Sequence, residues 1–284
     1  MERTFRPDPN RRAGADLRRG VRAGAGLSEA AMAAPSLAWR VEETCLNAFP
    51  SLRQIIYRDW LLRLSDGFTR RANSINPRAE RIESIEADID ACAGMFAAAG
   101  QQPVFRVPDI CDPRLDELLA ARCYSTEGRT VTLFAELSDA ECLVDAHAEI
   151  TARPTPDWLA AMGELQKRTP QHNASFAGIM AALAVPAGFA ALREDGELTA
   201  LTVGSIHDGI LCFESVVTAE SHRGRGHARR LLASLNAWAL AAGAKGVCLQ
   251  VEATNIAGRA LYSRLGLKRE LYGYHYRRAP RPAD

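Results

Sequence analysis

The amino-acid sequence predicts an α/β (α+β) protein of two lobes, each a mixed, mostly antiparallel sheet flanked by helices. The chain has 284 residues, which is long for one average domain and comfortable for two. Strand-like and helix-like segments follow in the same order twice along the chain. The clearest segment, Val216 to Leu232, indicates a strand that passes through a glycine-rich turn into a helix.

The composition is that of an ordinary soluble protein. Hydrophobic residues make up 47% and charged residues 24%, and the net charge of +1 gives no general reason to expect a nucleic-acid or membrane partner. No apolar run approaches the roughly 20 residues of a membrane span. The seven cysteines are odd in number and contain no Cys-x-x-Cys pair. We therefore expect a cytoplasmic protein with buried free thiols and no metal.

The first residues differ in amino-acid composition from the rest of the chain. Residues 1–38 are rich in arginine, alanine and glycine without a clear period, which predicts a disordered basic tail. An RNA-binding or targeting arm is the alternative, whereas a secretory signal is not expected because an apolar segment is missing. A further alternative is that translation begins at Met32.

The first lobe is expected to span residues 39–140. An Asp-Gly turn at Asp66 and Gly67 predicts a strand–turn–strand unit, and apolar residues at helical spacing predict a long helix ended by Gly100. The predicted helices are 41–49, 82–99 and 113–122, and the predicted strands are 60–64, 68–75, 104–107 and 129–137.

The second lobe is expected to span residues 146–280, after a polar turn into a short helix over residues 138–145. The predicted strands are 148–152, 187–193, 199–207, 210–218, 246–251 and 267–278, and the predicted helices begin near residues 155, 174, 228 and 255.

The turn Arg223-Gly-Arg-Gly-His-Ala228 has the features of a diphosphate site. The first amides of a helix lack internal partners and point outward, the helix dipole adds positive charge, and glycine allows close approach. The Walker pattern is absent, and a dinucleotide-binding Gly-x-Gly-x-x-Gly fails at Arg229. A solvated strand–helix turn without a ligand is the alternative.

A second motif follows the helix and a buried strand. It runs from Asn255 through Leu261-Tyr262 to Gly266-Leu267. Together with the glycine-rich turn it resembles the GNAT superfamily of acetyl-CoA-dependent N-acetyltransferases. The resemblance implies acetyl-CoA as co-substrate. It also implies that the strand over residues 210–218 splays away from the one over 246–251 and leaves a V-shaped slot. The residues that it places against acetyl-CoA are Val216, Val217, Thr218, Arg223, Gly224, Arg225, Gly226, His227, Ala228 and Asn255.

The resemblance also implies catalytic roles. Glu214 is the candidate base that deprotonates the amine, with Glu252 as the second candidate, and Tyr262 is the candidate acid for the departing thiolate. A backbone amide near Val216 or Val217 would polarise the thioester carbonyl. The alternatives are an outward-facing strand glutamate and a core tyrosine. His275 is a further candidate for the acceptor site.

The first lobe resembles a degenerate copy of the second. Leu119 corresponds to Tyr262, a shift of 143 (262 − 119). The segment Asn76 to Ile82, which precedes the first lobe's long helix, contains no glycine, so we expect no acetyl-CoA there. A group of polar residues indicates either a solvent-exposed strand face or, less favoured, an anionic-substrate surface. These residues are Arg63, Arg70, Arg71, Asn73 and Ser74.

The expected function is transfer of an acetyl group to a primary amine, most simply of a small molecule, by a monomer or homodimer. A longer acyl donor, a protein N-terminal or lysyl acceptor, and a sensor that binds acetyl-CoA without turnover are the alternatives; a Glu214 that points to solvent would favour the sensor. The resemblance implies that the two helices after the second lobe's first strand cover the acceptor, which makes His172, Asn173 and Phe176 candidate contacts, with ordinary packing favoured for Phe176.

Overall fold

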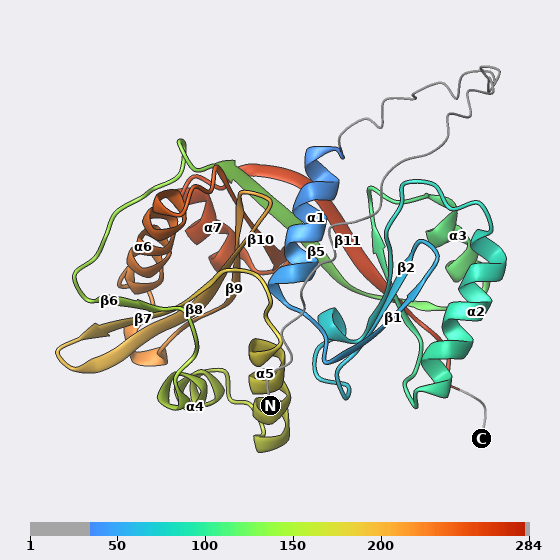
Figure 1. The fold of residues 1–284 in the computed structure, drawn as a ribbon, viewed down its shortest axis with the longest axis horizontal. Helices are drawn as coiled ribbons and strands as arrows, with labels where there is room; N and C mark the ends of the chain where they lie inside the picture. Colours follow the sequence, from blue (N-terminus) through green and yellow to red (C-terminus); the bar gives the residue numbers. More distant parts are fainter. Residues whose placement is uncertain (1–34, 282–284) are drawn as a thin grey trace, which may run out of the picture. The chain divides into compact units, whose positions relative to one another are not determined.

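The computed structural model describes residues 35–281 (Figure 1). The predicted tail lies outside these residues except at its end, where Ser36 caps a helix that begins at Leu37. The helices are α1 (Leu37–Ala48), α2 (Ile85–Ala98), α3 (Arg114–Ala121), α4 (Pro156–Leu165), α5 (Pro170–Ala181), α6 (His227–Ala241) and α7 (Ile256–Arg264), with short 3₁₀ turns η1 (Arg70–Ala72) and η2 (Glu220–His222). None of these helices has the length and hydropathy to cross a bilayer.

Eleven strands form one continuous sheet in the order β1-β2-β3-β4-β11-β5-β10-β9-β8-β7-β6. Two neighbouring pairs, β3–β4 and β9–β10, are parallel, and the others are antiparallel. The strands are β1 (Arg53–Tyr57), β2 (Trp60–Leu64), β3 (Ser74–Pro77), β4 (Val104–Pro108), β5 (Ser125–Glu136), β6 (Ala148–Thr151), β7 (Ala187–Glu194), β8 (Glu197–His207), β9 (Ile210–Thr218), β10 (Gly246–Glu252) and β11 (Arg269–Arg278). The predicted mixed, mostly antiparallel architecture is confirmed.

The two lobes exchange their last strands. The first lobe's β5 pairs with β10 of the second lobe, and the second lobe's β11 lies between β4 and β5. The parallel pair β3–β4, followed by α3 and β5, thus repeats as β9–β10, α7 and β11. The sequence predicted the repeat but not that the two sheets would be continuous.

The alternation of side chains along the strands separates two faces of the sheet. On one face α6 and α7 cover the second lobe, and α2 and α3 cover the first. The other face carries α1, α4 and α5. Figure 1 shows α1 running across the centre of the sheet, between the helices of the two lobes.

A buried charge cluster fixes α1 to the centre of the sheet. Glu42 of α1 accepts hydrogen bonds from Arg106 of β4, where the Nη2–Oε2 distance is 3.0 Å, and from the hydroxyl of Tyr272 of β11 at 2.6 Å. The Arg106 guanidinium carbon lies 3.7 Å from the centroid of the Tyr274 ring. Because both charged partners are buried, removing either one would leave an uncompensated charge in the interior.

Two expectations about secondary structure are wrong in part or in full, and one strand was not expected. The strand expected over residues 68–75 begins only at Ser74, as β3. Residues 68–73 form a turn and η1, because the Asn73 side chain accepts from the amides of Ser65 at 2.6 Å and Gly67 at 3.1 Å. The strand β1 was not predicted. Residues 138–145 form no helix, since α6 holds this segment through the Asn236 amide and Ser234 hydroxyl, which donate to its carbonyls.

Candidate active site

The parallel strands β9 and β10 separate halfway along their length, as the GNAT resemblance implied. They are in register from Gly246–Ile210 to Leu249–Phe213, and no pairing between them follows. A bulge in β9 against β8 accompanies the separation, with Ser215 at a φ of 55°. The far side of β9 from Glu214 to Thr218 therefore has no strand partner, which leaves backbone donors and acceptors available to a ligand.

The glycine-rich turn presents free amides at the start of α6. Gly224 and Gly226 have φ values of 76° and 85°, a conformation that disfavours other residues. Among the described residues, the backbone amides of 224–229 donate to no protein acceptor. The side chains of Arg223 and Arg225 are exposed beside them. This arrangement fits a diphosphate group.

His227 and Asn255, both predicted to contact acetyl-CoA, have side chains engaged with the protein. The His227 ring is buried, with Nδ1 at 3.2 Å from a Glu194 carboxylate oxygen, so only its backbone amide is directed to the turn. The Asn255 side chain caps α7 by accepting from the amide of Gly258 at 2.9 Å, as predicted. Val216, Val217 and Thr218 belong to the stretch of β9 that has no strand partner on the side of β10. Ala228 lies in the first turn of α6.

Replacing Gly226 with aspartate is expected to weaken acetyl-CoA binding at least about tenfold, which is about 1.4 kcal/mol. The new carboxylate would stand at the free amides and repel the diphosphate. Gly243→Asp is the matched control, because Gly243 ends the same helix with a φ of 86° and has the same open surroundings. Titration calorimetry measures the affinity and circular dichroism the fold. Equal affinity in the two variants would contradict the assignment, and binding that persists in Gly226→Asp at a second site would place acetyl-CoA in the first lobe.

Glu214 is buried where β9 and β10 separate, with 2% of its surface exposed. Its carboxylate accepts a hydrogen bond from the Arg71 guanidinium of η1, a residue of the first lobe. Burial raises the pKa of Glu214 to about 7, and the positive charge of Arg71 opposes part of that shift. The outward-facing alternative for Glu214 is wrong, and its pKa lies close to neutrality, as suits a proton acceptor.

Tyr262 lies on α7 in the core of the second lobe, on the other face of the sheet. Its ring is 8% exposed, and its hydroxyl forms no hydrogen bond to the described residues. Burial raises the pKa of Tyr262 to about 12, and the nearby charge of Glu214 adds to the shift. The phenol therefore keeps its proton at neutral pH and remains able to donate it.

A cavity of about 190 Å³ lies between elements of both lobes, and Arg71, the hydrogen-bond partner of Glu214, lines it. The first lobe contributes Arg70 and Arg71 of η1, and β10 contributes Glu252, the second candidate base. The Glu252 carboxylate is largely exposed and lies 3.8 Å from an Arg70 nitrogen. The remaining lining residues are Thr69, Thr130, Gln250, Tyr274 and Tyr276.

The polar group of the first lobe is neither a solvent-exposed strand face nor an open anionic surface. Arg63, Asn73 and Ser74 are buried, and Arg63 donates to the carbonyl of Phe49. Arg71 packs its guanidinium 5.0 Å from the centroid of the Phe49 ring, which directs the charge toward the second lobe. The contact of Arg71 with the second lobe was not predicted, because the sequence pattern indicated a strand where η1 forms.

The acceptor role suggested for His275 is wrong, and Phe176 has the ordinary packing role that was favoured for it. His275 lies on the opposite face of the sheet from Glu214, where its Nε2 is 2.6 Å from a carboxylate oxygen of Asp116 on α3. Phe176 is fully buried in the core between α4, α5 and the sheet. Asn173 is held near Leu159, with its Nδ2 at 3.4 Å from the carbonyl oxygen, and the exposed His172 stays an untested candidate.

The first lobe has no comparable glycine turn. Residues 78–84 connect β3 to α2 without a glycine, and Leu119 of α3, which corresponds to Tyr262, is fully buried. The prediction that this lobe does not bind acetyl-CoA therefore stays a prediction with a structural basis.

Comparison with known proteins agrees with the resemblance to N-acetyltransferases. Residues 38–278 match the family described as probable histone acetyltransferase Rv0428c, C-terminal. The chain is 25% identical over 245 residues to a protein described as uncharacterized N-acetyltransferase YobR from Bacillus subtilis (strain 168), and this match covers 84% of the chain and 97% of that protein.

Two solved structures share the fold. A GCN5-related N-acetyltransferase from Kribbella flavida has a TM-score of 0.64 at 17% identity, with 87% of this chain and 95% of that one covered. A tandem GNAT protein from the clavulanic acid biosynthesis pathway has a TM-score of 0.60 at 15% identity, with 79% of each chain covered. The second of these has the tandem arrangement that the internal repeat predicted.

Proposed function

Because the chain belongs to the Rv0428c C-terminal family of GNAT-type N-acetyltransferases, we propose that it transfers the acetyl group of acetyl-CoA to a primary amine of a small molecule. The observation that carries this proposal is buried Glu214 at the point where the strands separate, bonded to Arg71, which lines the cavity formed by both lobes. The donor binds along β9, with its diphosphate on the free amides of residues 224–229.

The reaction needs a neutral amine, whereas a free alkylamine is mostly protonated because its pKa is about 10.4. Glu214 takes the proton, directly or through water, and the amine attacks the thioester carbon. A backbone amide at Val216 or Val217 on the unpaired side of β9 stabilises the carbonyl oxygen. Tyr262 gives its proton to the sulfur as the carbon–sulfur bond breaks.

The shape of the acceptor cavity supports a small amine. Elements of both lobes line it, and its volume of about 190 Å³ suits a few heavy atoms of an acceptor. The exposed carboxylate of Glu252 in this lining can attract an ammonium group from solvent. The family description names a histone, so a protein lysine is the second candidate.

A screen of amines tests the proposal, with release of the free CoA thiol as the signal. Small polyamines, amino acids, amino sugars and lysine-containing peptides form the panel. Turnover of a small amine with a higher kcat/KM than any peptide supports the proposal. Preference for a peptide selects the protein acceptor, and calorimetric binding of acetyl-CoA without turnover of any amine selects the sensor.

We further propose that residues 39–140 and 146–280 are the two functional lobes. Because the two lobes share one sheet, we expect neither of them to fold alone. The first lobe then serves the reaction by supplying Arg71, which neutralises the ionised Glu214. We also propose that the protein is a cytoplasmic monomer or homodimer that binds neither nucleic acid nor membrane.

Replacing Arg71 with methionine tests the role of the first lobe. Without the guanidinium, the pKa of Glu214 should rise further and less of the carboxylate should be ionised at neutral pH. We expect kcat/KM for the amine at pH 7 to fall by about fivefold for a pKa rise of one unit, because the ionised fraction drops from about one half to about one tenth. Acetyl-CoA affinity should be unchanged by calorimetry. Arg53→Met is the control, because Arg53 is an exposed arginine of the same lobe. Similar kinetics in both variants would show that Arg71 does not act on the base.

A further inference from the structure

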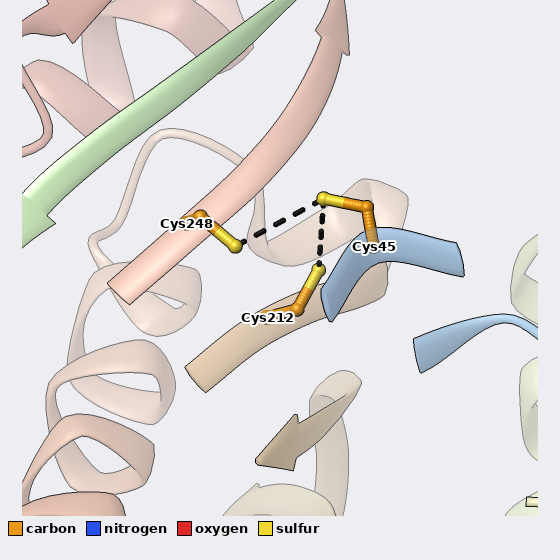
Figure 2. Close-up of side chains that lie close together, drawn as sticks. All are labelled: Cys45, Cys212 and Cys248. Atoms are coloured by element: carbon orange, nitrogen blue, oxygen red, sulfur yellow. Dashed lines mark hydrogen bonds between the residues drawn. The ribbon is translucent and has the colours of Figure 1, made fainter. Parts of the chain in front are cut away.

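Three cysteines from three separate elements meet below α1 (Figure 2). Cys45 of α1 lies over Cys212 of β9 and Cys248 of β10, which are partners in the register of the parallel pair. The Cys45 sulfur is 3.8 Å from that of Cys212 and 3.9 Å from that of Cys248, and all three side chains are buried. None of the three has a part in the proposed reaction.

The spacing of the sulfurs matches the coordination shell of a thiophilic cation. Zinc binds thiolate sulfur at about 2.3 Å in a tetrahedron, so two sulfurs on one ion lie about 3.8 Å apart. All three sulfurs here lie within 4.8 Å of one another. Because the protein core already holds them in this arrangement, an ion would bind with little reorganisation.

A carboxylate lies next to one of the three thiols, outside the cluster that the sulfurs form. The Oε1 atom of Glu214 is 3.9 Å from the Cys212 sulfur, on the strand that both residues share. A carboxylate oxygen is an established zinc ligand and completes the four positions that a closed site requires. Closing the site around an ion requires the Glu214 carboxylate to leave Arg71 and move toward the sulfurs of Cys45 and Cys248.

The surrounding charges favour a divalent ion. Three thiolates and a divalent cation together carry one negative charge. The nearby ionisable side chains comprise three guanidinium groups and two carboxylates, which together carry one positive charge. These are Arg63, Arg71, Arg106, Glu42 and Glu214. The bound ion would therefore leave no net charge in the interior.

We propose that Cys45, Cys212 and Cys248 form a binding site for a thiophilic divalent cation such as Zn²⁺, with the Glu214 carboxylate as fourth ligand. Binding replaces the three thiol protons, which are released to solvent, and no group is oxidised or reduced. The consequence for activity rests on the proposed function: an ion that holds Glu214 removes the base, so Zn²⁺ inhibits acetyl transfer. The prediction of no metal from scattered cysteines considered only spacing along the chain.

Titration of the reduced, chelator-treated full chain with Cd²⁺ tests the site, because cadmium thiolates absorb in the ultraviolet. We expect a sulfur-to-metal charge-transfer band that saturates at one ion per chain. Because α1 covers the sulfurs and slows access of the ion, the absorbance is read only after it has become constant at each addition. Zn²⁺ should displace the signal. Cys45→Ala should weaken binding at least tenfold, whereas Cys92→Ala, at a buried cysteine of the first lobe, should not. No band in the native chain, or equal bands in both variants, overturns the proposal.

A second measurement covers the case in which Cys45→Ala does not fold. X-ray absorption of the zinc-loaded native chain should show three sulfur ligands and one oxygen, and a shell of nitrogen and oxygen alone overturns the site. Neither measurement uses acetyl-CoA. A chain that binds Cd²⁺ at this site but acetylates no amine therefore supports the site while the proposed function fails, and an active acetyltransferase without the band overturns the site alone.

Discussion

Glu214→Gln should lower kcat/KM for amine acetylation by about 10²-fold or more, because a general base typically contributes about 10²- to 10⁴-fold. Glutamine has almost the same shape, and its amide oxygen can still accept the hydrogen bond from Arg71, so packing should be preserved. What it cannot do is take the proton of the attacking amine. The rate with a saturating amine, measured by thiol release, should fall while acetyl-CoA affinity by calorimetry stays the same.

The matched control is Glu252→Gln, which removes the other carboxylate near the acceptor cavity. Glu252 is largely exposed and only 3.8 Å from Arg70, so we expect mainly a higher KM for a cationic amine. A large loss of kcat in Glu252→Gln with little change in Glu214→Gln would assign the base to β10 instead. Thermal unfolding of both variants checks that Arg71, left beside a neutral amide in Glu214→Gln, does not destabilise the fold.

Local sequence signals were sufficient for the elements that hold the donor. The helix α6 has an apolar stripe and a glycine past its end, and β10 is a short apolar run, so both were predicted almost to their final bounds. The positive φ values of Gly224 and Gly226 explain why the turn needs glycine at these positions. The splay of β9 from β10 was expected from the GNAT resemblance rather than from the residues.

The acceptor side could not be predicted because distant segments build it. Arg71 is 143 residues from Glu214, and its position depends on the turn that Asn73 closes, which a period-two pattern does not reveal. Cys45 lies 203 residues from Cys248, and the strand exchange likewise depends on long-range pairing. No local periodicity encodes contacts of this kind.

The prediction that His275 faces the acceptor site was wrong for a simpler reason. Successive residues of a strand point to opposite faces of the sheet. Tyr274 and Tyr276 line the same cavity as Arg71, so His275 between them must face α3, where it meets Asp116. The alternation was visible in the sequence, but the face that holds the acceptor was not.

Tyr262→Phe should separate binding from chemistry. The phenol is proposed to protonate the CoA sulfur as the tetrahedral intermediate collapses, and burial raises its pKa to about 12, so it is protonated throughout the neutral range. Phenylalanine keeps the ring in the core under the sheet, and the hydroxyl has no hydrogen-bond partner among residues 35–281 to leave unsatisfied. Stability and acetyl-CoA affinity should therefore hardly change.

The turnover number should fall by about 10²-fold, the lower end for a general acid, because a thiolate leaves fairly well without help. An interaction made only in the transition state lowers kcat and kcat/KM together and leaves KM unchanged. Tyr274→Phe is the matched control, since that hydroxyl lies 3.3 Å from Gln250 at the acceptor cavity. If Tyr262→Phe raises only KM and Tyr274→Phe lowers kcat, the acid is Tyr274, on the same face of the sheet as Glu214, and Tyr262 is a core residue that shapes the slot.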